Sequence, residues 1–391
     1  MSSRDVIYIP ISGRIDSKNA QAKEKEIQDC LKGKMAEAIV LDAEGLEYIS
    51  SAGLRVLLRM RNKVPDITMI NVRDEVYYVL EMTGFTEILS VERMHRFVSV
   101  NGCEMIGKGA TGVIYRIDPE NVVKVYSGID TPDAILSERK LARMALILGL
   151  PTAISYDVVK TEEGYGAVFE LLNCRTLSSI IAKEPDRFEW CVREYTDLLK
   201  KIHGIVVPKG KLPDMKAEVL SWTEFLQEYL PEAEGKKLMQ LVRDIPGNNH
   251  MIHGDYHTRN VELQNDEIFL IDMATLSVGD PVFELGFMYN SFIGRAELDH
   301  DEVLRFQGYD YETAERFWRR TLAAYLGTED EEQIRETQDK ARVIAYARLV
   351  RHAVRKTGLD TEKGKREFEY YKKELLELLG RVDSVAVGTA E

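Results

Sequence analysis

The sequence has few cysteines, no long apolar run and no excess of basic residues. Its four cysteines are scattered, without a Cys-x-x-Cys pair or a zinc-ligand spacing, at Cys30, Cys103, Cys174 and Cys191. This pattern argues against a disulfide framework and predicts reduced, mostly buried thiols. No apolar run reaches the ~18 residues of a membrane span, and the first residues lack a signal-peptide core. We therefore expect a cytoplasmic protein without a membrane partner.

The charge balance is acidic. The 391 residues include 52 lysines and arginines against 65 aspartates and glutamates, a formal net charge of −13. This balance argues against nucleic acid as the main partner, because phosphate backbones are bound through an excess of Lys and Arg. It mildly favours a cationic substrate over an anionic one, although ordinary solubility would explain the same charge.

Strand-like and helix-like runs alternate through the first hundred residues. Runs of β-branched and apolar residues predict strands, and apolar residues at helical spacing predict helices. In chain order, the predicted elements are residues 6–11, 13–16, 20–31, 38–42, 52–64, 67–70 and 76–82. Alternating β and α elements predict an open α/β layer domain.

Two runs in this region are distinctive: Val-Leu-Asp-Ala-Glu-Gly-Leu at residues 40–46 and Ile-Ser-Ser-Ala-Gly-Leu-Arg-Val-Leu-Leu at 49–58. They closely resemble the STAS domain of bacterial anti-sigma factor antagonists. Gly-Arg-Ile-Asp at 13–16 and Met-Thr-Gly-Phe at 82–85 extend the resemblance to about residues 4–92. The resemblance implies a central sheet flanked by helices. It also implies an anti-sigma factor or another STAS-binding protein as a partner.

The same resemblance points to a phosphorylation site. In that family a serine at the start of the second helix is phosphorylated by a partner kinase and controls partner binding. The match of Ser-Ala-Gly-Leu to the family's Ser-Ser-Gly-Leu places this serine at Ser51, after Ser50 where the family usually has Asp. A helix N-terminus tolerates a phosphate, and about two negative charges would expel a docked partner. Simple capping by Ser50 or Ser51 is the alternative.

A glycine-rich motif opens the second part of the chain. Gly107, Gly109 and Gly112 form Gly-x-Gly-x-x-Gly-x-Val, and Lys124 follows twelve residues later in a β-branched run. Such glycines let backbone N–H groups approach the phosphates of ATP without a Cβ clash. Lys124 would hold the α and β phosphates, oriented by Glu138 from the next predicted helix. The alternative for Glu138 is an ordinary solvated helix position.

The most informative stretch is His-Gly-Asp-Tyr-His-Thr-Arg-Asn, which begins at His253. Phosphoryl transfer needs one carboxylate near the acceptor hydroxyl, and a second carboxylate with an amide oxygen for Mg²⁺. Asp255, Asn260 and Asp272 supply these groups in the right order, with Asp272 twelve residues after Asn260. We predict Asp255 as the catalytic base and the other two as magnesium ligands. His253 is expected to brace the loop by hydrogen bonds.

These motifs together resemble the aminoglycoside phosphotransferase and choline kinase family. The carrying features are His-Gly-Asp-x-His-x-x-Asn, Ile271-Asp272 in place of Asp-Phe-Gly, and Gly-Asp-Pro at 279–281. The resemblance spans about residues 100–380. It implies a two-lobed, protein-kinase-like α+β domain with a helix-rich C-terminal lobe, with ATP and Mg²⁺ as cofactors. It also implies a hinge whose backbone at Glu170 and Leu172 faces the adenine.

In this family, helices after the metal loop build the acceptor pocket. Six aromatic residues in those helices would either cage a cation or pack in the core: Tyr289, Phe292, Trp318, Tyr346, Tyr370 and Tyr371. Core packing is the more common role of aromatics at helical spacing.

The predicted organisation is a STAS domain at residues 1–95, a kinase N-lobe at 96–172, a C-lobe at 173–384 and a loose tail at 385–391. The predicted activity is transfer of the ATP γ-phosphoryl group to a hydroxyl on a small molecule. One alternative is a signalling kinase that phosphorylates a protein serine, such as Ser51 of its own or another STAS domain. A second is a non-catalytic, ATP-binding regulator of anti-sigma factor signalling.

Overall fold

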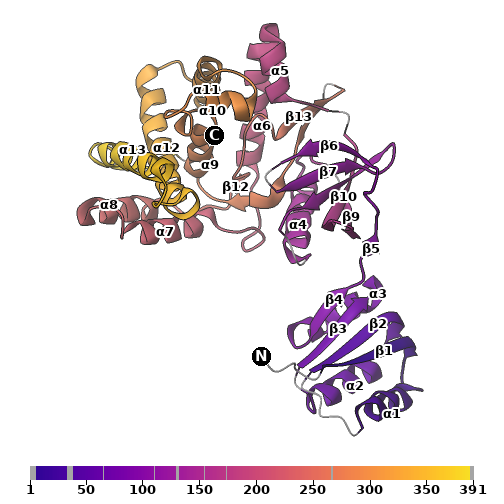
Figure 1. Ribbon diagram of the computed structural model, residues 1–391. Coiled ribbons are helices and arrows are strands. Elements are labelled where there is room, and N and C mark those ends of the chain that lie inside the picture. The colour runs from indigo at the N-terminus through magenta and orange to yellow at the C-terminus, as the bar shows by residue number, and fades with distance from the viewer. Residues whose placement is uncertain are drawn as a thin grey trace. The chain divides into compact units, whose positions relative to one another are not determined.

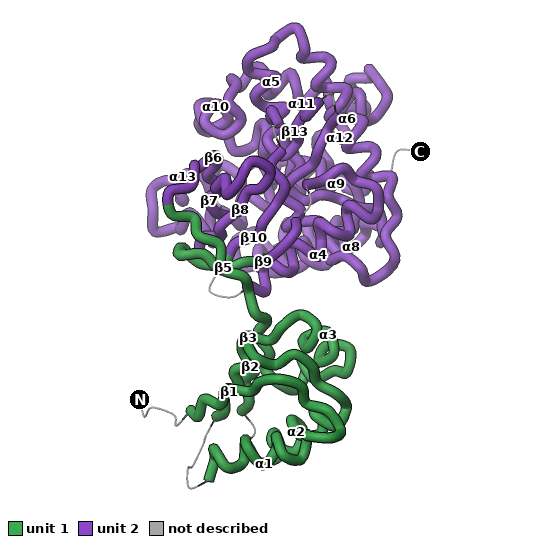
Figure 2. The backbone as a smooth tube through the Cα atoms, turned by 90° about the vertical axis from the view of Figure 1, so that its right-hand side faces the viewer, with its two compact units in different colours: residues 1–101, 158–165 green, residues 102–157, 166–391 purple. Residues whose placement is uncertain are grey.

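The computed structural model describes residues 6–32, 38–64, 66–109, 111–128, 132–153, 155–172, 174–265 and 267–387. The chain divides into two compact units, shown in different colours in Figure 2. The first unit is Met1–Asn101 with Val158–Tyr165, and the second is Gly102–Asp157 with Gly166–Glu391.

The first unit contains a four-stranded parallel sheet in the order β1-β2-β3-β4 (Figure 1). Its strands are β1 (Val6–Ile15), β2 (Ala38–Ile49), β3 (Asp66–Val72) and β4 (Ser90–Arg93). Its helices are α1 (Ala20–Leu31), α2 (Ser51–Arg61), α3 (Asp74–Met82) and the short η1 (Phe85–Glu87). Parallel neighbours need a crossover connection, and α1, α2 and α3 each follow one strand and precede the next. The predicted α/β layer domain is therefore confirmed.

The second unit begins with an antiparallel sheet and one helix. Its consecutive strands are β10 (Gly164–Glu170), β8 (Asn121–Tyr126), β7 (Gly112–Arg116) and β6 (Glu104–Lys108), with helix α4 (Asp133–Ile147). At the other end of the same sheet, β5 (Arg96–Phe97) pairs in parallel with Val159 and Lys160 of β9 (Ser155–Thr161). Residues 158–165, at the tip of the β9–β10 hairpin, cluster with the first unit.

The rest of the second unit is mainly helical (Figure 1). Its α-helices are α5 (Leu177–Lys183), α6 (Phe188–Gly204), α7 (Met215–Leu226), α8 (Glu232–Arg243), α9 (Pro281–Tyr289), α10 (Asp301–Gln307), α11 (Tyr311–Leu326), α12 (Glu331–His352) and α13 (Glu362–Leu379). Short 3₁₀ or π segments are η2 (Pro185–Arg187), η3 (Met273–Thr275), η4 (Asn290–Gly294) and η5 (Ala353–Thr357). Two small sheets contain β11 (Arg175–Thr176), β12 (Met251–Ile252), β13 (Val261–Gln264), β14 (Glu267–Leu270) and β15 (Ser277–Val278). The predicted helix-rich C-terminal lobe is confirmed.

Aromatic side chains fill the core of this helical part. Tyr289, Phe292, Trp318, Tyr346 and Tyr371 are buried, and Tyr370 packs against them while partly exposed. The Tyr289 and Tyr346 hydroxyls both donate to the Glu297 carboxylate, at 2.7 and 2.9 Å. These residues therefore serve as packing rather than as an open cage. No helix within the described residues is long and apolar enough to cross a membrane.

Candidate functional site

The glycine-rich loop is the turn between β6 and β7. The amide of Gly109 donates to the Gly112 carbonyl oxygen at 2.9 Å and closes this turn. A Cβ at Gly112 would lie 2.1 Å from the Val125 carbonyl oxygen, so only glycine fits beside β8. A Cβ at Gly109 would meet no described heavy atom within 4 Å, and one at Gly107 would make only ordinary contacts. Packing thus requires glycine at Gly112 alone, and the backbone at Gly109 is open to a ligand.

Lys124 and Glu138 form an ion pair beside this loop. Lys124 Nζ lies 3.2 Å from Glu138 Oε1, and the two side chains are 15% and 14% exposed. Lys124 is in the central strand β8, paired with Ile114 on one side and Ala167 on the other. A carboxylate at this distance fixes the direction of a long lysine side chain, so the structure brings together the two residues that the spacing suggested.

Tyr126 is a neighbour of Lys124 that the sequence motifs did not predict. It is two residues beyond Lys124, so both side chains lie on one face of β8, and Lys124 Nζ is 4.6 Å from the centre of its ring. Its hydroxyl is buried. Burial raises the pKa of Tyr126, and the charges of Glu138 and Asp272 raise it further. The hydroxyl therefore lies near two predicted ligand-binding carboxylates.

The catalytic-loop motif follows β12 and is braced by His253. The amide of Asp255 donates to His253 Nδ1 at 3.3 Å, and His253 Nε2 lies 3.2 Å from the Ile271 carbonyl oxygen. Because Nδ1 accepts, the ring proton belongs on Nε2, which donates to Ile271. Burial lowers the pKa of His253, which agrees with a neutral ring. His253 thus ties the backbone at Asp255 to the segment that ends at Asp272.

Glu284 of α9 also binds the backbone of this loop, although the sequence motifs did not predict this role. The fully buried Glu284 carboxylate accepts the backbone N–H groups of His253 and Gly254, the latter at 3.0 and 3.2 Å. Burial raises the pKa of Glu284 to about 7, against the lowering effect of these hydrogen bonds. A signal was available, since a lone acidic residue inside an apolar helix is rare unless it has a partner.

Gly254 allows the catalytic loop to pass close to η3. Its φ is +82°, and a Cβ there would lie 2.6 Å from the Thr275 carbonyl oxygen. The loop therefore passes too close to η3 for any side chain at this position. The N-terminus of α9 is fixed separately, because the Asp280 carboxylate accepts the Val282 amide at 2.9 Å. Asp280 of the Gly-Asp-Pro motif is therefore the N-cap of α9.

Asp255 presents an ionised carboxylate to solvent. Its side chain is 40% exposed, and Oδ2 lies 3.5 Å from Nε2 of the buried His257. Burial raises the pKa of Asp255, but the hydrogen bond with His257 and nearby positive charge, including that of Arg348, lower it to about 2. At neutral pH the group is therefore a carboxylate that can accept a hydrogen bond from a hydroxyl.

Asn260 and Asp272 lie close to Asp255 through a short chain of hydrogen bonds. Asn260 Nδ2 donates to the Asp255 carbonyl oxygen at 2.9 Å, which leaves Oδ1 as the ligand end of the amide. The Ile271 amide donates to the Asn260 carbonyl oxygen at 3.0 Å, one residue before Asp272. Asp272 has φ 63° and ψ 70°, a left-handed conformation that costs a non-glycine residue energy and often marks a functional position.

The predicted hinge lies at the end of β10. Glu170 is the last residue of that strand and pairs with Asn121 in the register. The Leu171 amide donates to the Glu120 carbonyl oxygen at 2.6 Å, and Leu172 is half-buried. The chain here passes from the antiparallel sheet to the helical part of the unit.

Ser51 is the first residue of α2 and is exposed. The capping role belongs to Ser50, whose hydroxyl accepts the Ala52 amide at 3.2 Å. Two residues after Ser51, a Cβ at Gly53 would lie 2.6 Å from Ile49 and 2.8 Å from Ile15, so α2 begins against the ends of β1 and β2. The sheet therefore fixes the start of α2 while the Ser51 hydroxyl remains accessible.

Two protein families match the chain. The family described as phosphotransferase enzyme family matches residues 103–336, and the STAS domain matches residues 2–99. Both resemblances drawn from the motifs are confirmed.

Two curated relatives match the STAS part. BtrV of Bordetella bronchiseptica, named as an anti-sigma factor antagonist, is 34% identical over 85 residues, or 21% of this chain and 72% of BtrV. The anti-sigma F factor antagonist of Paenibacillus polymyxa is 24% identical over 92 residues, or 22% of this chain and 79% of that protein.

A solved structure matches the second unit. The crystal structure of the ADP-bound aminoglycoside phosphotransferase APH(2'')-Ib aligns with a TM-score of 0.50 and 14% sequence identity. The alignment covers 72% of this chain and 95% of that one. At this identity the likeness shows a shared kinase-like fold.

Proposed function

The chain belongs to the phosphotransferase enzyme family and carries a STAS domain, and we propose that it transfers the γ-phosphoryl group of ATP to a hydroxyl acceptor. The observation that carries this proposal is the hydrogen-bonded arrangement of Asp255, Asn260 and Asp272. Asn260 donates to the Asp255 backbone, and its own carbonyl accepts from the residue before Asp272. One base and two oxygen ligands are thereby held within one loop region.

In this proposal Asp255 orients the acceptor hydroxyl and accepts its proton. Its low pKa makes it a weak base, which suits a reaction whose transition state is loose and depends mainly on positioning. Asn260 Oδ1 and the Asp272 carboxylate would hold Mg²⁺, which neutralises charge on the β and γ phosphates. Such hard oxygen ligands, few in number, suit an ion that keeps phosphate and water in its remaining positions.

The nucleotide would lie against the glycine-rich loop. The open backbone at Gly109 can approach phosphate oxygens, and Lys124, oriented by Glu138, can reach the α and β phosphates. The backbone around Glu170 and Leu172 would face the adenine. In the STAS part, an anti-sigma factor or another STAS-binding protein is the proposed partner.

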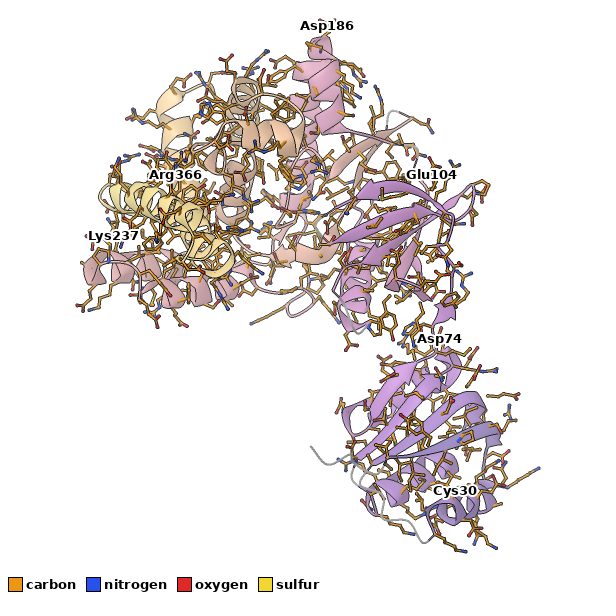
Figure 3. The ribbon with its side chains drawn as sticks, viewed as in Figure 1. Cys30, Asp74, Glu104, Asp186, Lys237 and Arg366 are labelled. Atoms are coloured by element: carbon orange, nitrogen blue, oxygen red, sulfur yellow. The ribbon has the colours of Figure 1, made fainter. Side chains whose placement is uncertain are left out.

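The proposal is tested by nucleotide binding and magnesium-dependent ATP hydrolysis in the full-length protein. Asp272→Asn should reduce hydrolysis at saturating ATP by at least about a hundredfold, because the metal loses a charged ligand. Asp186→Asn, at an exposed position labelled in Figure 3, is the matched control and should retain activity. Equal hydrolysis by the wild type and Asp272→Asn would contradict the proposed metal site.

A second candidate acceptor is the hydroxyl of Ser51. The observation that favours it is that Ser50 takes the capping role and leaves Ser51 exposed. Incubation with ATP and Mg²⁺ followed by intact-mass measurement would then show about 80 Da added per chain. This adduct should vanish in both Ser51→Ala and Asp255→Asn. An unchanged mass in the wild type would remove this candidate.

A further inference from the structure

Four arginines lie on the C-terminal part of α12, on the π segment η5 and directly after η4, and we call them the arginine row: Arg295, Arg348, Arg351 and Arg355. Positions 348, 351 and 355 are three and four residues apart, which places them on one face of α12 and of the π segment that continues it. Arg295 directly follows the other π segment, η4. Single-turn π segments occur often at functional sites.

The row lies on aromatic rings rather than on carboxylates. The guanidinium carbons of Arg348, Arg351 and Arg355 lie 4.2, 5.2 and 5.4 Å from the ring centres of their partners. Those partners are Phe287 of α9 and Trp222 and Phe225 of α7. In the part of the chain that the structure describes, no Asp or Glu oxygen lies within 4.0 Å of the guanidinium nitrogens of the row.

Other basic residues in this region do have partners. Earlier in α12, Arg335 pairs with Glu332, and Arg342 pairs with Asp339 and Glu374 at 3.1 Å. Lys237 pairs with Asp383 at 2.9 Å, and Arg366 donates to the Leu298 carbonyl at 3.0 Å, both labelled in Figure 3. The members of the row differ in this respect from these paired neighbours.

Arg348 links the row to the loop of Asp255 through α9. It stacks on Phe287, and Glu284, one turn earlier in α9, accepts the amides of His253 and Gly254. The charges of Arg348 and Asp255 act on each other, as do those of Arg348 and Arg295.

Burial lowers the pKa of the Arg348 guanidinium, and Arg295 lowers it further. The acids that oppose this charge are Asp255, Glu218 and Glu284, whereas His352, on the same stretch of α12, adds basic character. Arg348 and Arg351 are half-buried, and Arg295 and Arg355 are exposed. Like charges gathered in this way are stabilised when an anion binds to them.

We propose that the arginine row binds an anionic group, a phosphate or a carboxylate, carried by the hydroxyl acceptor. This inference rests on the proposed function, because it assigns the chemical class of that acceptor. A guanidinium stacked on an aromatic ring keeps its edge N–H groups free for two-point contact with a carboxylate or phosphate. Arg348 would then hold the acceptor with its hydroxyl directed to Asp255.

The local charge of the arginine row bears more directly on the acceptor than the net charge of the whole chain. The net charge of −13 mildly favoured a cationic substrate, but charges more than about 10 Å away are largely screened at physiological salt. The row also disfavours Ser51 as the acceptor, because the helix that follows this serine carries Arg55, Arg59 and Arg61. A small anionic hydroxy compound fits the row better than this basic segment.

The test uses the full-length protein saturated with ADP and Mg²⁺, titrated calorimetrically with four small probes. Glycerol 3-phosphate and glycerate carry a phosphate and a carboxylate, glycerol is neutral and choline is cationic. We expect at least one anionic probe to bind at least about tenfold more tightly than glycerol, with choline no better than glycerol. The stronger of the two anions identifies phosphate or carboxylate as the recognised group.

Substitutions locate the effect. Arg348→Gln and Arg355→Gln should each weaken binding of the favoured anion by about tenfold without changing the ADP affinity. Arg355 is exposed, so its substitution keeps the test valid if Arg348→Gln impairs folding. Arg335→Gln, on the same helix but paired with Glu332, is the matched control and should bind like the wild type.

The outcomes separate this inference from the proposed function. If ADP fails to bind, the proposed nucleotide site fails. If ADP binds normally but neither anion exceeds glycerol, or both row variants bind the anions as the wild type does, the anionic acceptor is overturned while phosphoryl transfer can still stand.

Discussion

At the scale of single residues, two buried side chains hold the loop that carries Asp255. Neutral His253 links the Asp255 amide to the Ile271 carbonyl, and Glu284 accepts two backbone N–H groups of the same loop. Neither side chain faces the proposed acceptor. Their role is to fix the position of Asp255 relative to Asp272, on which an in-line transfer depends.

Glu284→Gln should destabilise the protein by about 1–3 kcal/mol, because one buried N–H loses its carboxylate acceptor. The free energy of unfolding from urea titration measures this loss. Glu218→Gln, a substitution of the same kind on α7, removes no backbone hydrogen bond of the loop and should cost less. Equal stability of Glu284→Gln and the wild type would contradict the role assigned to Glu284.

The stability that Glu284 contributes should depend on pH. Its folded-state pKa is raised to about 7 from an ordinary value of 4.5, so the folded state holds the proton more tightly. The contribution is complete below about pH 4.5 and is lost as pH rises through 7. The unfolding free energy of the wild type relative to Glu284→Gln should therefore be larger at pH 5 than at pH 8. A difference that grows with pH would show that the hydrogen bonds outweigh burial.

At the scale of elements, two glycines of the glycine-rich hairpin have different roles: Gly112 is required for packing, and Gly109 leaves the backbone open to a ligand. Gly112→Ala should destabilise the protein by about 2–4 kcal/mol, since its Cβ would overlap the β8 backbone 2.1 Å away. Gly109→Ala should change the unfolding free energy by less than about 1 kcal/mol but weaken ATP binding. Thermal unfolding and nucleotide titration of the two variants test this. An equal loss of unfolding free energy in both variants would contradict the open space at Gly109.

The start of α2 offers a second test at this scale. Ser50→Ala removes the cap of the helix and should cost about 1 kcal/mol, whereas Ser51→Ala should cost little because its exposed hydroxyl caps nothing. Unfolding of the two variants under one set of conditions gives the comparison. A larger loss for Ser51→Ala would reverse the two assignments.

The elements also show what the sequence could predict. Helix α1 has the predicted bounds, residues 20–31, because the apolar residues at helical spacing extend over this range. The predicted strand at 38–42 continues to Ile49, since Gly45, Leu46, Tyr48 and Ile49 still pair with β1. The apolar spacing did not predict the π segments η4 and η5. Each inserts one residue into a helical turn, and this depends on how α12 packs with α9 and η4.

At the scale of the whole molecule, motif spacing predicted the residues with chemical groups and two of the residues that position them, His253 and Glu138, but not all of them. Asp255, Asn260 and Asp272 were recognisable because their order alone predicts phosphoryl transfer. A lone acidic residue in an apolar helix indicates that Glu284 has a buried partner. Which groups it binds, and where the arginine row lies, depend on how the helices pack near the loop, and one sequence does not contain that information. The net charge of −13 averages over the whole chain, so it does not give the local charge around the row.

The central claim is that this chain transfers phosphoryl groups through Asp255. The most direct measurement is ³¹P NMR of full-length protein with ATP, Mg²⁺ and the favoured anionic probe, beside Asp255→Asn. The account predicts a new phosphomonoester signal and ADP with the wild type, and a rate at least about a thousandfold lower with the variant. The same product formed at the same rate by Asp255→Asn would contradict it.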